Sequence, residues 1–193
     1  LEPVHNIGRG SDPLTGTFLR DYVGGGVGDV QEAMFPSGFY RFTRRSFLAS
    51  DQYVSGLVWV FREGQATFIR GYEARAALEA QGLGMERTAR EFRGLVLRQE
   101  EGISALISRK DAMTASFNFL NRVTSFENNF WVGYVTRTVR EAADSDRVVR
   151  MVYEYLGTGI GKAKAAGKKA GYCHLDDLLP FHQRLLQPDV PFR

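Results

Sequence analysis

The stretch YVSGLVWVFREGQATFIRGY, from Tyr53 to Tyr72, decides the fold. Two runs of β-branched and aromatic residues flank Arg62-Glu63-Gly64-Gln65, a pattern typical of a β-hairpin whose tight turn needs a positive φ at Gly64. Apolar residues occupy both faces of the first arm, so we expect a strand that is covered on both sides or that faces a filled interior. Because a single hairpin is only marginally stable, it must pair with further strands.

The composition is that of one ordinary globular domain. The chain has 193 residues, 44% of them hydrophobic and 24% charged, which is enough to bury a core without disulfide bonds. Its single cysteine, Cys173, excludes an internal disulfide. The sequence has no apolar run of the length of a transmembrane helix and no signal peptide pattern. We therefore expect a cytoplasmic protein with no membrane association, and the net charge of +3 does not require a nucleic-acid partner.

Alternation of apolar and polar residues continues on both sides of the hairpin. Most of the connections between these runs are short, so neighbouring strands must be antiparallel. We predict a mainly β (α+β) protein of about eight antiparallel strands, in an up-and-down barrel or a strongly curved sheet, with short helices at both termini. The predicted strands are 39–47, 53–62, 66–73, 91–98, 103–109, 115–121, 129–137 and 148–155.

Three parts of the chain follow from this pattern. Residues 1–37 are predicted as a linker with a short helix that begins at Asp12-Pro13 and is closed by Gly24, followed by a glycine-rich hinge. Residues 38–156 form the barrel or sheet, with a short helical insertion at 74–81. Residues 157–193 are predicted as a basic connector and a final helix that Asp177 caps.

Common catalytic signatures are absent from the sequence. Gly157 to Lys162 resembles a Walker A loop only superficially, because Leu156 and Ala163 stand where that motif needs a glycine and a hydroxyl residue. The potential metal ligands Cys173, His174 and His182 lack the paired spacing of a zinc site. We expect no catalytic residue, no metal and no cofactor, and Cys173 to be a buried thiol beside surface histidines.

Aromatic and polar side chains on the predicted strands are the candidates for a binding site. A barrel interior that mixed them would form a ligand pocket in which an inward arginine binds an anion or a carboxylate. The competing interpretation is an ordinary aromatic core with arginines that face water, since the inward face cannot be assigned for strands that are apolar on both faces. The candidate ligand-binding residues are Tyr40, Trp59, Arg93, Asn118, Trp131, Arg137 and Arg150.

The segment RVVRMVYEYLGTGIGKAKAAGKKAGYC, from Arg147 to Cys173, resembles the C-terminal region of proteobacterial helix-turn-helix (XRE-like) transcriptional regulators. Asn121-Arg122-Val123 and the strand around Gly133 add to this resemblance. The resemblance implies a β-rich sensory or effector domain that follows a DNA-binding segment. Residues 1–37 are too few for such a segment, so we expect DNA contact only through a segment absent from this chain. Because Leu1 is not a methionine, we expect a piece cut from a longer protein.

Three functions remain open at this point. The first is a non-catalytic regulatory domain that senses a small-molecule effector or self-associates; we expect a homodimer, because helix-turn-helix regulators read two half-sites. The second is a stand-alone small-molecule-binding barrel, either a carrier or a cyclase-like enzyme. The third is an oligomerisation domain whose core is packed solid.

Overall fold

The structure is a computed structural model that describes residues 21–28, 30–73, 86, 90–127, 129–138 and 146–191. The body of the predicted N-terminal helix and the predicted insertion at 74–81 lie outside the described residues. In chain order the elements are α2 (Gly24–Val27), β1 (Gly38–Arg45), β2 (Tyr53–Glu63), β3 (Ala66–Tyr72), β4 (Glu91–Gln99), β5 (Gly102–Arg109), β6 (Ala115–Val123), β7 (Phe130–Arg137), β8 (Val148–Gly157), α5 (Ile160–Lys168), β9 (Gly171–Cys173), a 3-10 turn η1 (Leu175–Asp177) and α6 (Pro180–Leu186).

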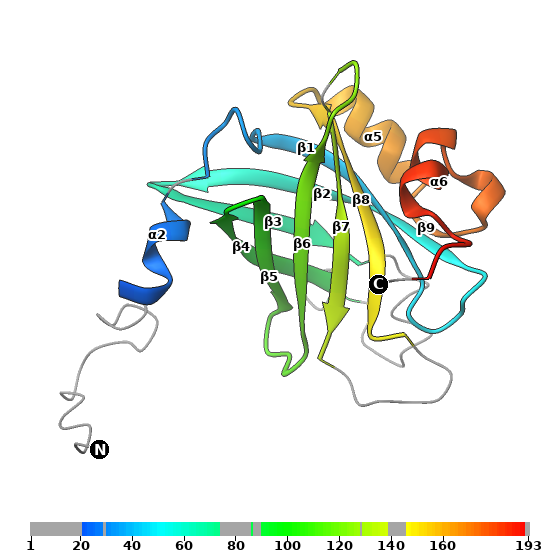
Figure 1. Ribbon diagram of the computed structural model, residues 1–193, viewed down its shortest axis with the longest axis horizontal. Coiled ribbons are helices and arrows are strands. Elements are labelled where there is room, and N and C mark those ends of the chain that lie inside the picture. Colours follow the sequence, from blue (N-terminus) through cyan, green and yellow to red (C-terminus); the bar gives the residue numbers. More distant parts are fainter. Residues whose placement is uncertain are drawn as a thin grey trace.

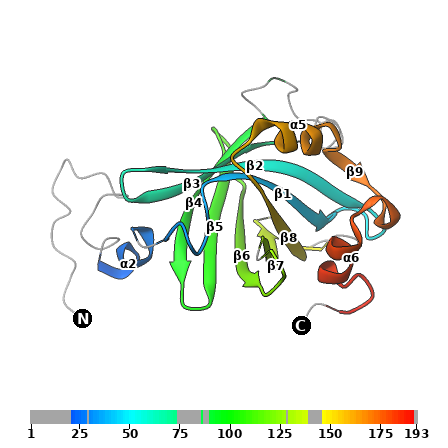
Figure 2. The same ribbon diagram turned by 90° about the horizontal axis from the view of Figure 1, so that it is seen from above.

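Eight antiparallel strands form a closed barrel (Figures 1 and 2). Each strand pairs with the next, and β8 returns to pair with β1. The predicted strands are confirmed, since each begins and ends within two residues of its predicted bounds. Of the two predicted architectures, the closed barrel is the one observed.

A ninth strand, β9, was not predicted. It pairs with the first residues of β2, Tyr53 to Ser55. The partner strand β3 reaches only as far as Val58, so it leaves this stretch of the β2 edge unpaired. Three residues carry no readable alternation, and β9 exists because that edge needs a partner.

Two of the helices, α5 and α6, cover the same side of the barrel. Helix α5 packs against β1, β2 and β8, and α6 packs against β1 and β8, whereas α2 lies against β4 (Figure 1). Strand β1 and the first residues of β2 are therefore covered on both faces, which explains why the first arm of the hairpin is largely apolar on both. No helix among the described residues is long and apolar enough to cross a membrane.

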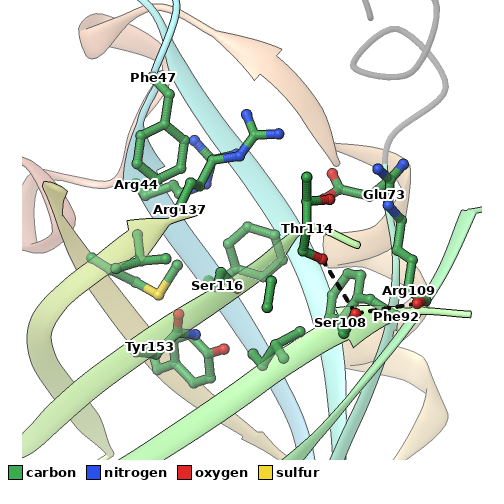
Figure 3. Close-up of a pocket in the computed structure, with 16 residues that line it drawn as sticks. Arg44, Phe47, Glu73, Phe92, Ser108, Arg109, Thr114, Ser116, Arg137 and Tyr153 are labelled. Carbon is green, nitrogen blue, oxygen red and sulfur yellow. Dashed lines mark hydrogen bonds between the residues drawn. The ribbon is translucent and has the colours of Figure 1, made fainter. Parts of the chain in front are cut away.

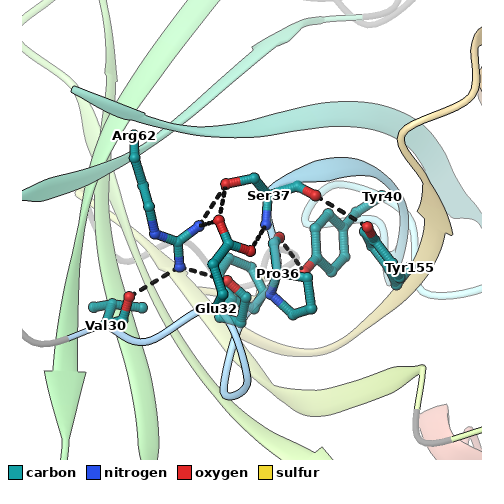
Figure 4. A network of polar contacts seen from close by, with 8 residues as sticks. Val30, Glu32, Pro36, Ser37, Tyr40, Arg62 and Tyr155 are labelled. Carbon is teal, nitrogen blue, oxygen red and sulfur yellow. Dashed lines mark hydrogen bonds and ion pairs between the residues drawn. The ribbon is translucent and has the colours of Figure 1, made fainter.

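One end of the barrel is closed by residues 30–37, which we call the plug (Figure 4). The Phe35 side chain of the plug is fully buried, stacks on Tyr40 at 4.8 Å between ring centres, and meets Trp131 edge to face at 5.4 Å. The Arg62 guanidinium, which points inward from β2, donates to Glu32 at 2.7 Å and to the carbonyl oxygens of Val30 and Phe35 at 2.9 Å each. Aromatic packing and these hydrogen bonds make this end of the barrel solid.

The outward face of five neighbouring strands carries a row of apolar side chains. Direct register partners run from Phe61 on β2 through β3, β4 and β5 to Phe117 on β6. Leu106 in this row is 57% exposed and Phe117 is 38% exposed. The row, here called the outer band, consists of Phe61, Phe68, Leu95, Leu106 and Phe117.

Two details of the flanking segments differ from the predictions. Gly24 was expected to end a helix and begin a hinge, but Gly24–Val27 is itself a helical turn. Asp177 was expected to cap the final helix; its carboxylate instead accepts a hydrogen bond from the His174 backbone at 2.9 Å and so caps η1, while α6 begins two residues after Leu178, at Pro180. A helical turn therefore replaces the expected hinge, and a 3-10 turn precedes the final helix in place of a direct cap.

Candidate functional site

A cavity of about 100 Å³ occupies the barrel at the end opposite the plug (Figure 3). Apolar side chains from β1, β4, β5, β7 and β8 form its walls. An eight-stranded barrel is just wide enough for its side chains to fill the interior or to hold one small ligand, so this space is of the size expected for the second case. The apolar wall residues are Phe42, Phe92, Ile107, Val135 and Met151.

The rim of the cavity is positively charged. Its lining includes three arginines, Arg44, Arg109 and Arg137, against one carboxylate, Glu73. Figure 3 shows Arg44 and Arg137 together beside Phe47, with Glu73 and Arg109 on the opposite side. The formal charges of the described lining residues therefore sum to +2 at neutral pH.

Phe47 orients two of these cations. The guanidinium carbon of Arg44 lies 4.5 Å from the centre of the Phe47 ring, and that of Arg137 lies 5.3 Å from it. Cation–π contacts of this kind hold an arginine in place without neutralising its charge. The Phe47 ring therefore holds both guanidinium groups at the rim.

Burial lowers the pKa of Arg44 to about 10. Its guanidinium stays protonated at neutral pH, yet it is poorly solvated. It donates to the carbonyl of Arg45 at 3.0 Å, and within the described ranges no carboxylate forms an ion pair with it. Glu73 acts on Arg44 only through its charge.

The floor of the cavity is polar at one point. The Asn118 side chain is 2% exposed, and that of Tyr153 is 1% exposed. The Asn118 amide donates a hydrogen bond to the Tyr153 hydroxyl. In the part of the chain that the structure describes, the Asn118 Oδ1 atom has no hydrogen-bond partner. If the amide were turned over, its nitrogen would be left without a partner instead. An unpaired buried amide group costs about 1–3 kcal/mol, so it calls for a partner from outside the chain.

The structure brings together only part of the predicted ligand-binding set. Asn118 and Arg137 line the cavity. Tyr40 and Trp131 also face the interior, but they pack on Phe35 at the plugged end. Four of the seven candidates therefore face the interior, and two of these four line the cavity.

The other three predicted residues lie on the outer wall of the barrel. Trp59 is 41% exposed. Arg93, with 67% of its side chain exposed, pairs with Glu91 at 2.6 Å. Arg150 donates to the carbonyl oxygens of Gln187 and Pro191, so it fastens the C-terminal segment to β8. The sequence could not assign these residues because β-branched and aromatic side chains occupy both parities of their strands.

Sequence reasoning missed several lining residues. Residues two apart on a strand point to the same face. Once Tyr40 is assigned to the interior, Phe42 and Arg44 on β1 must therefore face the interior too. Glu73 and Phe47 lie just beyond strand ends, where the alternation carries no information. Tyr153 lies in the stretch MVYEYL, which alternates no more clearly than its neighbours.

A buried polar chain lies outside the barrel wall, beneath α6. The ring of His182 contacts the Thr43 hydroxyl through Nδ1 at 2.9 Å and the Glu154 carboxylate through Nε2 at 3.2 Å, and Arg41 donates twice to the same carboxylate oxygen. The order hydroxyl, imidazole, carboxylate resembles a catalytic triad. Thr43 and His182 are each 1% exposed, however, and neither lines the cavity or the two hollows beside α5 and the C-terminal segment, so we interpret these hydrogen bonds as a lock that holds α6 on the barrel.

Other candidate chemistry finds no support in the geometry. His182 was expected at the surface and is buried. Burial raises the pKa of Cys173, which disfavours a reactive thiolate. The described residues contain no group of three His, Cys, Asp or Glu side chains that could hold a metal ion. Two further hollows, of about 320 and 530 Å³, lie between the barrel and the C-terminal segment and between the barrel and α5.

These observations define a closed antiparallel barrel with a plug at one end and an arginine-rimmed cavity at the other. The chain matches no family model, no curated protein and no solved structure in the comparisons with known proteins.

Proposed function

We propose that the chain is a ligand-binding barrel whose cavity takes one small organic molecule. The observation that carries this proposal is Asn118, a 98% buried amide with an unpaired arm in a cavity of about 100 Å³. A core selected only for packing would place an apolar side chain there. The cavity also argues against a barrel that is packed solid.

The biological role that we propose for this binding is regulatory and non-catalytic. The resemblance of residues 147–173 to helix-turn-helix regulators supports an effector domain that responds to a small molecule in the cytoplasm, with DNA contact left to a segment outside this chain. The second candidate is a stand-alone carrier or cyclase-like enzyme, which the cavity supports equally well. The coding sequence upstream of Leu1 discriminates between them, because only a regulator would encode a helix-turn-helix segment there.

The outer band favours one further element of this role, self-association. Contiguous exposed apolar rows mark interaction surfaces, and a homodimer is the assembly that a regulator of two half-sites needs.

Native mass spectrometry of the purified chain tests the ligand proposal. We expect a native mass that exceeds the denatured mass by a small molecule, and we expect that difference to disappear in the variant Phe42→Trp, which fills the cavity. The matched control is Leu57→Trp, one strand away and on the outward face. A ligand-free protein whose cavity also fails to bind any member of a fragment library would contradict the proposal.

A further inference from the structure

The cavity has three chemical zones that follow one another along the barrel. The Arg44 and Arg137 guanidinium groups stand at the rim, the apolar walls come next, and the Asn118 amide lies at the floor. On β6 the register pairs Ser116 with Arg137 and Asn118 with Val135, so Asn118 lies two residues deeper than the level of Arg137. Two residues of an antiparallel strand rise about 7 Å, which is the span of one aromatic ring or a short alkyl chain.

The rim selects for charge. Arg44 carries a partly buried cation with no ion-pair partner among the described residues, and among the described lining residues three arginines stand against one carboxylate. A neutral ligand would leave Arg44 as it is, whereas an anion would compensate a charge that has already been taken out of water. A planar carboxylate matches the geometry of a guanidinium fork.

The walls and the floor select for the rest of the molecule. Aromatic and aliphatic walls disfavour a fully hydrated inorganic ion, which would have to lose its water without apolar contacts in return. The unpaired arm of Asn118 favours a hydroxyl or a similar polar group at the far end of the ligand, because a hydroxyl can both donate and accept.

From these zones we infer that the ligand is a small organic monocarboxylate, bound with its carboxylate between Arg44 and Arg137, its apolar body against Phe42 and Phe92, and a terminal polar group on Asn118. The inference rests on the proposed ligand-binding function and names the class of ligand that the same cavity takes.

Matched pairs of probes test the charge requirement. Benzoate and benzamide have the same shape and differ in charge, and hexanoate and hexanamide form an aliphatic pair. We expect each carboxylate to bind at least about tenfold more tightly than its amide, because a hydrogen bond to a charged group is worth about 1.5–3 kcal/mol. Calorimetric titration gives the affinities, and chemical-shift changes of the Asn118 side-chain amide locate binding in the cavity.

Arginine variants assign the carboxylate to its partners. Arg44→Gln and Arg137→Gln are each expected to weaken benzoate binding by about tenfold or more and to leave benzamide unchanged. The control Arg93→Gln removes an arginine from the outer wall and is expected to change neither. If a variant unfolds, the retained benzamide affinity is lost as well, so a folding defect is recognised directly.

A second comparison tests the floor. We expect 4-hydroxybenzoate to bind more tightly than benzoate to the wild-type chain. In Asn118→Leu we expect the two affinities to be about equal. Loss of all carboxylate binding in Asn118→Leu would contradict the assigned orientation. Inorganic phosphate is included as an anion without an apolar body and is expected not to compete with benzoate.

The outcomes separate the inference from the proposed function. Equal binding of amides and carboxylates in the cavity, or a neutral molecule that co-purifies, overturns the monocarboxylate inference and leaves the ligand-binding function intact. Competition by phosphate overturns it in favour of an inorganic anion. If no probe and no fragment perturbs the Asn118 resonance, both the inference and the proposed function fail.

Discussion

At the residue scale, the two tryptophans stand on opposite sides of the barrel wall. Trp131 is 1% exposed and contacts Phe35 and Tyr40, whereas Trp59 is 41% exposed and stacks on Phe61 at 4.6 Å. We expect Trp131→Ala to lower the free energy of unfolding by about 3–5 kcal/mol and Trp59→Ala to lower it by much less. Urea denaturation of both variants measures the difference, and equal losses would mean that the wall is assigned with the wrong face inward.

Gly133 and Gly161 form a second contrasting pair. A Cβ at Gly133 would lie 1.8 Å from the Phe119 carbonyl oxygen on the neighbouring strand, and one at Gly161 in α5 would meet nothing within 4 Å. Gly133→Ala must therefore push β6 and β7 apart, and we expect a loss of more than about 2 kcal/mol. Gly161→Ala is expected to raise stability by about 0.5–1 kcal/mol, because alanine favours the helix. Thermal unfolding of the two variants should shift in opposite directions.

The candidate site was predictable only in its chemistry. Aromatic and arginine residues on strands predict a pocket that mixes apolar and cationic groups, and Asn118 and Arg137 belong to it. Which arginines face inward depends on pairing register, a property of several strands at once. Arg93 and Arg137 look alike in the sequence, yet one pairs with Glu91 in water and the other stands over Phe47.

At the scale of elements, the strands were predictable because each carries its own alternation and its own turn signals. Gly64, with φ of 60°, marks the β2–β3 turn as expected. The strand β9 and the 3-10 turn η1 were not predictable, because each depends on a partner elsewhere in the chain. Strand β9 pairs with the part of β2 that β3 leaves free. In η1, the Leu175 carbonyl accepts a hydrogen bond from Gln183 of α6. Three-residue elements have no period from which they could be read.

The docking of α6 depends on one carboxylate. Burial alone would raise the pKa of Glu154, but hydrogen bonds from His182 and Arg41 outweigh it and hold that pKa below the ordinary value of 4.5. A depressed carboxyl pKa contributes stability that is complete above the unfolded-state pKa and is lost as pH falls through the folded-state pKa. The contribution of Glu154 should therefore be complete at neutral pH and diminish as pH falls below the ordinary carboxyl pKa of 4.5.

We test this contribution with Glu154→Gln. The wild-type protein should be more stable than the variant at pH 7, and the difference in free energy of unfolding should shrink as pH falls below 4.5. The control Glu63→Gln changes an exposed carboxylate in the β2–β3 turn and should show no such dependence. If the difference in free energy of unfolding stayed constant down to pH 3, the charge of Glu154 would not contribute, and the packing of its side chain would account for the stabilisation. Hydrogen exchange in α6 should rise in the variant, because the lock on that helix is lost.

At the scale of the whole molecule, the two sides of the barrel are covered differently. Helices α5 and α6 cover β1 and β8, and α6 also reaches β7, where Phe181 lies 4.4 Å from Phe130 between ring centres. Among the described elements, the larger helix contacts that involve α5 and α6 do not include β5 or β6. The outer band ends on β5 and β6, where Leu106 and Phe117 are its most exposed described members. Its side chains together with Trp59 expose on the order of 400 Å², and a standard interface needs about 800 Å² per partner. With a polar rim added, the band is large enough for the core of a dimer interface.

A second copy of the chain is the partner that suits this surface. In a two-fold interface the same patch meets itself, so like charges at its centre would repel. The outer band has no charged member, and the neighbouring row pairs Glu91 with both Arg70 and Arg93, at 2.9 and 2.6 Å. Two bands can therefore face each other without a charge at the centre of the contact, as two packed sheets do.

We expect sedimentation equilibrium to show a dimer of the wild-type chain at micromolar concentration and a monomer for Leu106→Lys, since a buried lysine in a two-fold core would face its own copy. Ile160→Lys is the control, an exposed apolar residue of α5 on the covered side.

Disulfide cross-linking locates the contact along the band. Cys173 is the only cysteine of the chain, so Cys173→Ser provides a background without thiols. In that background Leu95→Cys, Leu106→Cys and Phe117→Cys are introduced one at a time and oxidised. A self-disulfide forms efficiently only beside the two-fold axis, so the most reactive position locates that axis along the band. If wild-type chain is a monomer and none of the three cysteines cross-links, the outer band does not join two copies of this chain.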